Sequence, residues 1–459
     1  MSAIIISAIW GVVMMFSGIF IKEKLAIRNL AIVGMALLLI SNIAEQYGFQ
    51  LFHINTHGML FFDKFSLLFN SIAIASTLLY FILSARDITE VGVNAADYFA
   101  LIFFVLCGVA VSSSFNTLLM LFLGIEIISI PLYILTGSDK KNLKSNEASL
   151  KYFLMGSFST GIMLMGIALI YGSRGSFSLE NMQASSIVAM QPLLVVGLLL
   201  LLISMSFKVS AAPFHFWTPD VYDGAPTVFT SFMATIVKTG VFIAFLRLFD
   251  AAYGNSGGQW KMVLAFIIAA TLFIGNVTAV FQQSVKRMLA YSSIAQAGFM
   301  FFALFSYNDI AKEGLILYAA AYSLATIGIF AILVKMKDYS FDGFNGLASY
   351  QPALAATNAI FLLSLAGIPL TAGFFAKYYM LASAVKNGSY LWLVIFAVLC
   401  AAISVYYYFR VIQAMYFKEA TEKQTIVVTP IFKGMLVVIS IIIILLGIFP
   451  QWLLSKMYF

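Results

Sequence analysis

Long apolar runs separated by short polar stretches extend along the whole sequence of 459 residues. Each run has about 20 residues or more, and an α-helix of that length, rising about 1.5 Å per residue, crosses a hydrocarbon core about 30 Å thick. Polar, glycine-containing and proline-containing positions divide the chain into fourteen predicted membrane-spanning segments. Their approximate ranges are 3–20, 26–44, 60–84, 96–114, 116–136, 147–172, 191–216, 225–249, 260–281, 288–306, 312–336, 352–385, 390–417 and 430–453.

The composition supports this pattern, because hydrophobic residues make up 62% of the chain and charged residues only 10%. Such a balance excludes a soluble globular protein and predicts an all-α membrane protein. The first run follows no basic segment and ends without a cleavage site of small residues, so we expect it to be retained as a helix. Cys107 and Cys400 lie within apolar runs, where packing is favoured over a disulfide.

Basic residues gather in every second loop, beginning with Lys22, Lys24 and Arg28. The positive-inside rule places these loops on the cytoplasmic side and, with an even number of spans, both chain termini on the outer side. The net charge of +7 is dispersed over loops and forms no single patch. We therefore expect the lipid bilayer, and no nucleic acid, as a partner.

Two spans are interrupted by proline and glycine in their interiors, the seventh at Pro213 and the twelfth at Pro369. Proline lacks an N–H and clashes with the carbonyl four residues before it, so Pro213 is expected to free the Val209 carbonyl and Pro369 that of Leu365. Free backbone groups at membrane depth occur only beside a wet cavity or inside protein. We predict that helices seven and twelve are discontinuous.

The two breaks stand at corresponding places in the chain. Pro213 lies about 117 residues after position 96, and Pro369 about 109 residues after position 260. Interrupted spans at matching positions are typical of transporters built from two inverted repeats. The predicted organisation is N-terminal helices in 1–95, a first five-helix repeat in 96–250, a second, inverted repeat in 260–417, and a last helix in 430–453.

Few ionisable residues fall within the apolar spans, and a charge at a helix centre costs about 2.5 to 3.5 kcal/mol. Several such charges are expected to mark a pathway. The one carboxylate is Glu126, and the cations are Lys151, Lys208, Lys238 and Lys377. Lys151 lies near the end of its span, where its side chain could also extend to the interface.

These residue types suit the transfer of protons. Burial in a medium of low dielectric constant favours the neutral form of a lysine, whereas a nearby carboxylate favours the charged form. At about 4 Å and an effective dielectric constant near 20, a glutamate–lysine pair is worth about 4 kcal/mol. Moving Glu126 toward or away from a lysine is therefore expected to switch that lysine between holding and releasing a proton.

His215 follows Lys208 by seven residues, which corresponds to two helical turns on one stripe and about 10.5 Å of axial rise. Direct proton exchange over that length is excluded. We expect water admitted by the break at Pro213 to connect the two side chains, although an ordinary interfacial histidine fits the sequence as well.

The remaining histidines, His53 and His57, lie four residues apart in a polar stretch, which a solvated loop explains better than a metal site. Paired axial ligands for a membrane haem and a cysteine cluster for iron and sulfur are both missing from the sequence. No cofactor is expected in this chain.

Five stretches of the sequence resemble the antiporter-like membrane subunits of respiratory complex I. They are "FKVSAAPFHFWTPDVYDGAPT", "LGIEIISIPLYIL", "EASLKYFLMGSFSTG", "SVKRMLAYSSIAQAGF" and "LAGIPLTAGFFAKYY", and the resemblance covers roughly residues 60 to 417. It implies a bundle of fourteen helices with two inverted five-helix repeats. It also implies roles in proton transfer for Glu126, Lys151, Lys208, His215, Lys238 and Lys377.

The resemblance further implies a bacterial cytoplasmic-membrane protein that moves protons while partner subunits carry NADH, flavin, iron–sulfur clusters and quinone. Its implied neighbours are a second antiporter-like subunit and small helical membrane subunits. A subunit of a sodium/proton antiporter or of a related membrane-bound hydrogenase is the alternative, and the lysine at 377 favours the respiratory family. A purely structural scaffold would tolerate loss of the charges of Lys208, Lys238 and Lys377.

Overall fold

The computed structural model describes residues 1–182, 191–253, 259–386, 388, 390–419 and 426–457. Over these residues the chain consists of helices and loops, with three isolated bridges between loop residues, which confirms the all-α fold class. Twelve of the described helical segments are long and apolar enough to cross a membrane.

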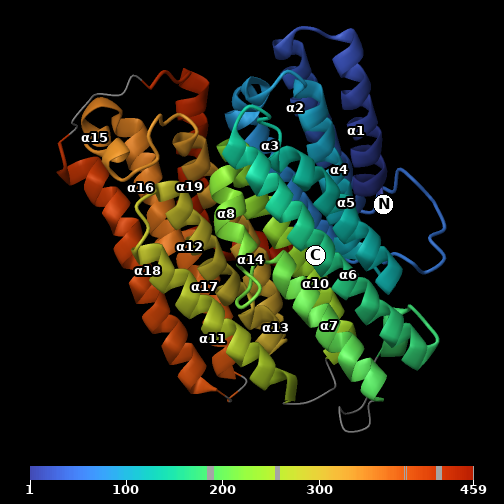
Figure 1. Cartoon of the computed structure of the whole chain (residues 1–459). Helices are drawn as coiled ribbons and strands as arrows, with labels where there is room; N and C mark the ends of the chain where they lie inside the picture. Colours follow the sequence, from blue (N-terminus) through green and yellow to red (C-terminus); the bar gives the residue numbers. More distant parts are fainter. Residues whose placement is uncertain (183–190, 254–258, 387, 389, 420–425, 458–459) are drawn as a thin grey trace.

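The first half of the chain forms the right-hand part of the molecule in Figure 1. Its long helices follow the predicted spans within a few residues. The elements are α1 (Ser2–Phe20), α2 (Lys24–Gln46), α3 (Lys64–Val91), α4 (Ala95–Ser114), α5 (Leu118–Thr136), α6 (Leu143–Arg174), η1 (Leu179–Met182), α7 (Pro192–Lys208), α8 (Trp217–Gly224), α9 (Thr227–Phe232), the π-helical turn η3 (Met233–Val237) and α10 (Lys238–Tyr253).

The second half lies mainly on the left in the same view. Its elements are α11 (Gln259–Val280), α12 (Val285–Met300), α13 (Phe302–Ser306), α14 (Asp309–Leu333), η4 (Asp342–Phe344), α15 (Leu347–Tyr350), α16 (Pro352–Ala366), α17 (Ala372–Lys386), α18 (Leu391–Phe417), α19 (Pro430–Ile448), α20 (Gln451–Leu454) and η5 (Ser455–Met457).

Both spans that the sequence predicts to be discontinuous are divided into two helices, whereas α5 continues through Pro131. α7 ends at Lys208 and α8 begins at Trp217, while α16 ends at Ala366 and α17 begins at Ala372. Gly367, with φ of +84°, ends α16 in the left-handed conformation that favours glycine. A Cβ atom at this position would lie 2.9 Å from Lys377 Cδ, so the glycine also leaves room for that lysine.

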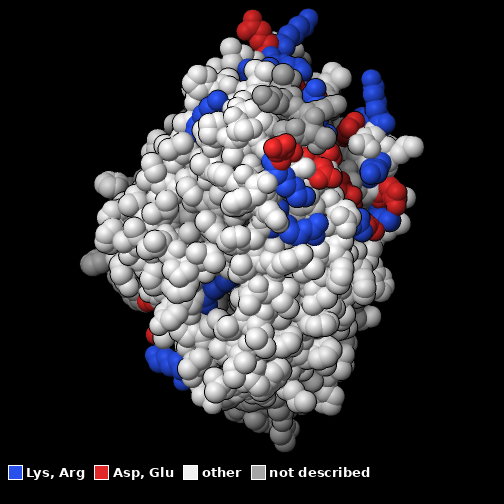
Figure 2. Space-filling view, turned by 90° about the vertical axis from the view of Figure 1, so that its left-hand side faces the viewer, with Lys and Arg blue, Asp and Glu red and all other residues white. Residues whose placement is uncertain are grey.

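Burial separates a central set of helices from a peripheral set. The membrane-length segment of α14 is wholly buried, whereas in α1 only 28% of the corresponding residues are buried. The outer helices expose large apolar side chains, as lipid-facing helices do. On the face in Figure 2, charged side chains gather mostly near the upper end, and the middle is almost entirely uncharged. This uncharged region is the surface expected to contact acyl chains.

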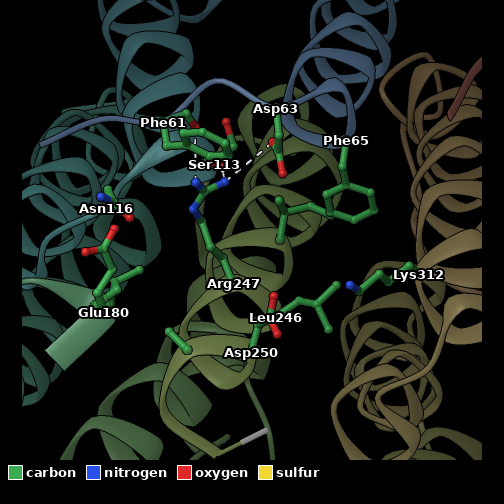
Figure 3. A pocket seen from close by; sticks show the side chains of 13 residues that line it. Phe61, Asp63, Phe65, Ser113, Asn116, Glu180, Leu246, Arg247, Asp250 and Lys312 are labelled. Atoms are coloured by element: carbon green, nitrogen blue, oxygen red, sulfur yellow. Dashed lines mark hydrogen bonds and ion pairs between the residues drawn. The ribbon is translucent and has the colours of Figure 1, made fainter. Parts of the chain in front are cut away.

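Arg247, on α10, ties together three segments at the end of the bundle where η1 lies. Its Nε donates to the Phe115 carbonyl at 2.6 Å, and its terminal nitrogens donate to the carbonyls of Ser113 at 3.3 Å and Phe61 at 3.1 Å. Asp63 Oδ1 lies 3.5 Å from the guanidinium. Figure 3 shows these groups on the wall of a hollow of about 300 Å³. Arg247 thus fastens α10 to the C-terminal end of α4 and to the segment before α3.

Replacing Arg247 with alanine is expected to destabilise the folded protein by at least about 2 kcal/mol, because three carbonyls lose a charged donor. The midpoint of thermal unfolding in detergent measures this. Arg174→Ala, at an exposed position in the last turn of α6, is the matched control. Equal midpoints for the two variants would contradict the fastening role.

Candidate functional site

Glu126 on α5 and Lys208 at the end of α7 form an ion pair inside the first half of the bundle. The carboxylate Oε1 lies 3.8 Å from Lys208 Nζ. The Thr160 hydroxyl stands between them, donating to Glu126 Oε1 at 2.7 Å and accepting from Lys208 Nζ at 3.4 Å. Ser129 Oγ accepts a second bond from the ammonium at 2.9 Å. Three helices therefore hold this pair in place, and one hydroxyl connects its two charges.

Lys238 lies directly after the π-helical turn η3 and is 1% exposed. Its ammonium donates to the carbonyl and the hydroxyl of Ser293, at 2.9 and 3.0 Å, and lies 5.8 Å from the centre of the Tyr222 ring. π-helical turns within α-helices frequently accompany functional sites. In this chain the π-helical turn directly precedes Lys238, whose ammonium group is buried.

Lys377, on α17, is held by the end of α16 and is 7% exposed. Its ammonium donates to the carbonyls of Leu365 and Ala366, both at 2.9 Å, and faces the Phe299 ring at 4.8 Å. The Leu365 carbonyl is the one that the sequence predicts to be free. Among the described residues, no carboxylate pairs with Lys377 or Lys238. Both ammonium groups are compensated by neutral oxygens and aromatic faces.

At the first break, the carbonyl that gains a side-chain donor is that of Phe207, which accepts from Trp217 Nε1 at 3.1 Å. Among the described residues no hydrogen bond reaches the Val209 carbonyl, which the sequence predicts to be free. α7 ends before the proline, and the following segment turns, with Ser210 at φ of +65°.

A chain of uncharged polar groups joins the surroundings of Lys238 to those of Lys377. Gln296 Nε2 donates to the Leu365 carbonyl at 3.0 Å and to the Tyr408 hydroxyl at 3.1 Å, and Gln296 Oε1 accepts from Tyr318. The Tyr408 hydroxyl also bonds to Ser292, the neighbour of the serine that holds Lys238. Hydroxyl and amide groups thus extend from Ser292 to the carbonyl that holds Lys377, and Ser292 adjoins Ser293, the partner of Lys238, only along the chain.

Sequence reasoning missed Gln296, Tyr318 and Tyr408 because none of them is charged. One signal was available in "SSIAQAG": Ser292 and Gln296 are four residues apart, which places them on the same face of a helix. Thr160 gave no comparable signal. Its position between Glu126 and Lys208 depends on the packing of three helices.

The expected helical stripe from Lys208 to His215 is wrong. Residues 209–216 lie between α7 and α8, so the two side chains share no helix. His215 is buried within this segment and stacks on Phe216, with ring centres 4.7 Å apart. Around the break, the buried hydroxyls of Ser206, Ser210 and Thr218 have no hydrogen-bond partner among the described residues. Buried polar atoms of this kind are the places where internal water is stabilised.

Lys151 lies apart from the Glu126–Lys208 pair. Its ammonium contacts Glu147 at 2.8 Å and Asp220 at 3.1 Å, and its side chain is 43% exposed. Arg287 also binds Asp220, at 3.1 Å. Lys151 is therefore part of a charged cluster at the end of the bundle that carries the basic loops.

His53 and His57 both lie exposed in the loop between α2 and α3. The described part of the chain contains no group of three or more histidine, cysteine or carboxylate side chains suited to a metal ion. Cys107 and Cys400 are buried free thiols.

Comparison with known proteins adds to this geometry. A family model described as NADH:quinone oxidoreductase/Mrp antiporter, TM, matches residues 115–404. The chain is 41% identical to the NADH-quinone oxidoreductase subunit N of Cytophaga hutchinsonii, over 99% of both chains. It is 38% identical to the protein of the same name from Flavobacterium psychrophilum, over 99% of this chain and 100% of the relative.

Among solved structures, the fold resembles a chain of respiratory complex I from Thermus thermophilus with bound aureothin. The two sequences are 30% identical, the TM-score is 0.85, and the match covers 99% of this chain and 98% of the other.

Replacing Thr160 with valine is expected to weaken the attraction between Glu126 and Lys208 by about 1.5 to 3 kcal/mol, because a charge-assisted hydrogen bond is lost at similar side-chain volume. The carboxylate stretching band of Glu126, assigned by comparison with Glu126→Gln, should shift in infrared difference spectra. Thr160→Ser keeps the hydroxyl and should preserve the band. An unshifted band in the valine variant would show that the hydroxyl does not connect the pair.

Proposed function

The chain belongs to the NADH:quinone oxidoreductase/Mrp antiporter family of membrane subunits, and from this premise we propose that it acts as subunit N of a bacterial NADH-quinone oxidoreductase. It is a proton-translocating membrane subunit of that complex. The family match spans 115–404, and the similarity to the named relatives covers nearly the full length of both chains. The identity of 41% and 38% to these relatives favours the oxidoreductase over a separate sodium/proton antiporter.

In this proposal the chain performs no redox chemistry itself. NADH, flavin, iron–sulfur clusters and quinone belong to partner subunits, and a second antiporter-like subunit and small helical subunits are its neighbours in the membrane. The end that carries the basic loops faces the cytoplasm, and both termini lie on the outer side.

One observation carries the proposal: of the three lysines Lys208, Lys238 and Lys377, whose side chains are all enclosed in the bundle, only the first has a carboxylate partner among the described residues. Lys208 pairs with Glu126, while Lys238 and Lys377 bind neutral oxygens. A buried ammonium that lacks a counter-ion releases its proton more readily than one beside a carboxylate. The three sites therefore differ in how firmly they hold a proton, which a directional relay requires.

The Glu126–Lys208 pair is the switchable element of this relay. At an effective dielectric constant near 20, a pair about 4 Å apart gains about 4 kcal/mol. Withdrawing Glu126 removes that stabilisation, and Lys208 then yields its proton toward the centre of the chain. The hydroxyls of Ser206, Ser210 and Thr218 around the break offer positions for the water that carries it onward.

The second half of the route runs from Lys238 to Lys377. Lys238 donates to Ser293, and the adjacent Ser292 begins the series of hydroxyl and amide groups that ends at the Leu365 carbonyl. Hydroxyl groups both donate and accept, so they can relay a proton, whereas the Gln296 amide positions its neighbours. Lys377 then faces the exit half of the path.

We also propose that 96–250 and 260–417 are inverted five-helix repeats. The support is that each predicted repeat contains one divided span, with breaks at 209–216 and 367–371. Each break lies beside one of the buried lysines, Lys208 and Lys377.

The test removes one ammonium at a time. In inverted membrane vesicles, Lys208→Ala and Lys238→Ala are each expected to lower both NADH oxidation with quinone and acidification of the interior by about tenfold or more, because a positioned proton-transfer group is lost. Lys386→Ala, at an exposed position at the end of α17, is the control. Undiminished activities with normal assembly would favour the structural scaffold.

Gln296→Leu tests whether the polar groups around Gln296 connect Lys238 with Lys377 in proton transfer. It removes both donor bonds at similar volume, and we expect acidification to fall by about tenfold, as the loss of one to two hydrogen bonds of about 1 kcal/mol each implies. Gln282→Leu is the matched control, since the side chain of Gln282, just after the end of α11, donates among the described residues only to the nearby Thr278 carbonyl. Equal acidification by the two variants would exclude Gln296 from the route.

A further inference from the structure

A second hollow, of about 360 Å³, lies away from the relay at the end of the bundle that carries the basic loops. It is enclosed by the beginning of α2, the last turns of α3 and the start of α19. None of the relay residues lines it.

The hollow is lined by three cations and by no carboxylate: Arg28 on α2, Arg86 on α3 and Lys335 after α14. Two of these have acidic partners nearby. Lys335 binds Asp87 at 2.5 Å, and Arg86 pairs with Glu90 at 3.2 Å on the exposed surface.

Arg28 is different. Its Nε is buried and has no hydrogen-bond partner among the described residues, and no described carboxylate forms an ion pair with it. An unpaired guanidinium group at a protein surface offers a planar set of donors that matches two oxygens of one phosphate group. One positive charge therefore remains in excess over the two neighbouring carboxylates.

The rest of the lining is apolar and continues onto the lipid-facing surface. Leu25, Ile82 and Ile431 form parts of the wall, and Leu25 and Ile431 are exposed. Farther along the same helices, Leu37 and Ile40 of α2 and Val438 and Ile441 of α19 are exposed as well. A ligand with an anionic head and long apolar chains would meet matching surfaces at both ends.

The start of α19 adds to the positive potential of the hollow. Thr429 caps this helix by accepting from the Phe432 N–H at 3.2 Å, and both residues line the hollow. The N-terminal end of a helix carries a partial positive charge and favours anions. Basic hollows between membrane helices on the cytoplasmic side are suited to anionic lipid headgroups.

We propose that this hollow binds an anionic phospholipid, with the phosphate group on Arg28 and the acyl chains along α2 and α19. The site is distinct from the proton relay. The ligand contributes to anchoring α19, the last long helix, against α2 and α3.

The experiment uses the complex assembled with the full chain and placed in phosphatidylcholine nanodiscs that contain a photoreactive phosphatidylglycerol. Peptides of α2 and α19 should be labelled, and Arg28→Gln should reduce that labelling by about tenfold, because charge-assisted bonds to the phosphate are lost. Arg174→Gln, at the opposite end of the bundle, should label like the unchanged protein. Arg28→Lys keeps the charge but loses the paired donors, so its labelling should lie between those of Arg28→Gln and the unchanged protein, which separates ligand loss from misfolding.

Four results would overturn the assignment. Equal labelling of the Arg28→Gln and unchanged proteins would remove Arg28 as the headgroup contact. Equal labelling by photoreactive phosphatidylcholine would mean that the hollow does not select anionic lipid. Abolition of the labelling by inorganic phosphate would identify the occupant as a free phosphate ion. A benzophenone side chain at position 25 should cross-link to lipid, and cross-linking to another subunit would identify a protein segment as the occupant.

Discussion

The constraint on which this structure depends is that an ammonium group inside the bilayer must be surrounded by oxygen atoms or lose its proton. Lys208, Lys238 and Lys377 meet this constraint in different ways, the first with a carboxylate and hydroxyls, the others with backbone carbonyls, a hydroxyl and aromatic rings. The difference in compensation is what distinguishes the three sites chemically. If the helices buried only apolar surface against one another, the ammonium groups would have no polar partners and the three sites would not differ in this way.

Three irregularities of the helices coincide with these groups. α7 ends at Lys208, the π-helical turn η3 ends just before Lys238, and α16 ends at the carbonyls that hold Lys377. In an uninterrupted α-helix these carbonyls would be used by the helix itself. The break after α16 therefore provides acceptors within the membrane that regular secondary structure cannot supply.

The sequence predicted the class of fold, the divided spans and the enclosed lysines Lys208, Lys238 and Lys377, because these follow from hydropathy and from the chemistry of proline and lysine, whereas Lys151 is 43% exposed. It predicted the Leu365 carbonyl as a free acceptor, and that carbonyl binds Lys377. It was wrong on the stripe from Lys208 to His215, since the chain leaves the helix at the first of these residues. Thr160 could not be identified, and the spacing of Ser292 and Gln296 indicated only a shared helix face, because uncharged polar residues occur in many membrane helices and tertiary packing brings them beside the lysines.

The sharing of the Leu365 oxygen between Lys377 and Gln296 affects what genetics can detect. Every amino-acid replacement at position 365 retains the peptide carbonyl, so a scan of side chains would score this position as tolerant even if the acceptor were indispensable. Main-chain chemistry is hidden from such scans. An ester in place of the amide on the C-terminal side of Leu365 would weaken the oxygen as an acceptor while leaving every side chain unchanged.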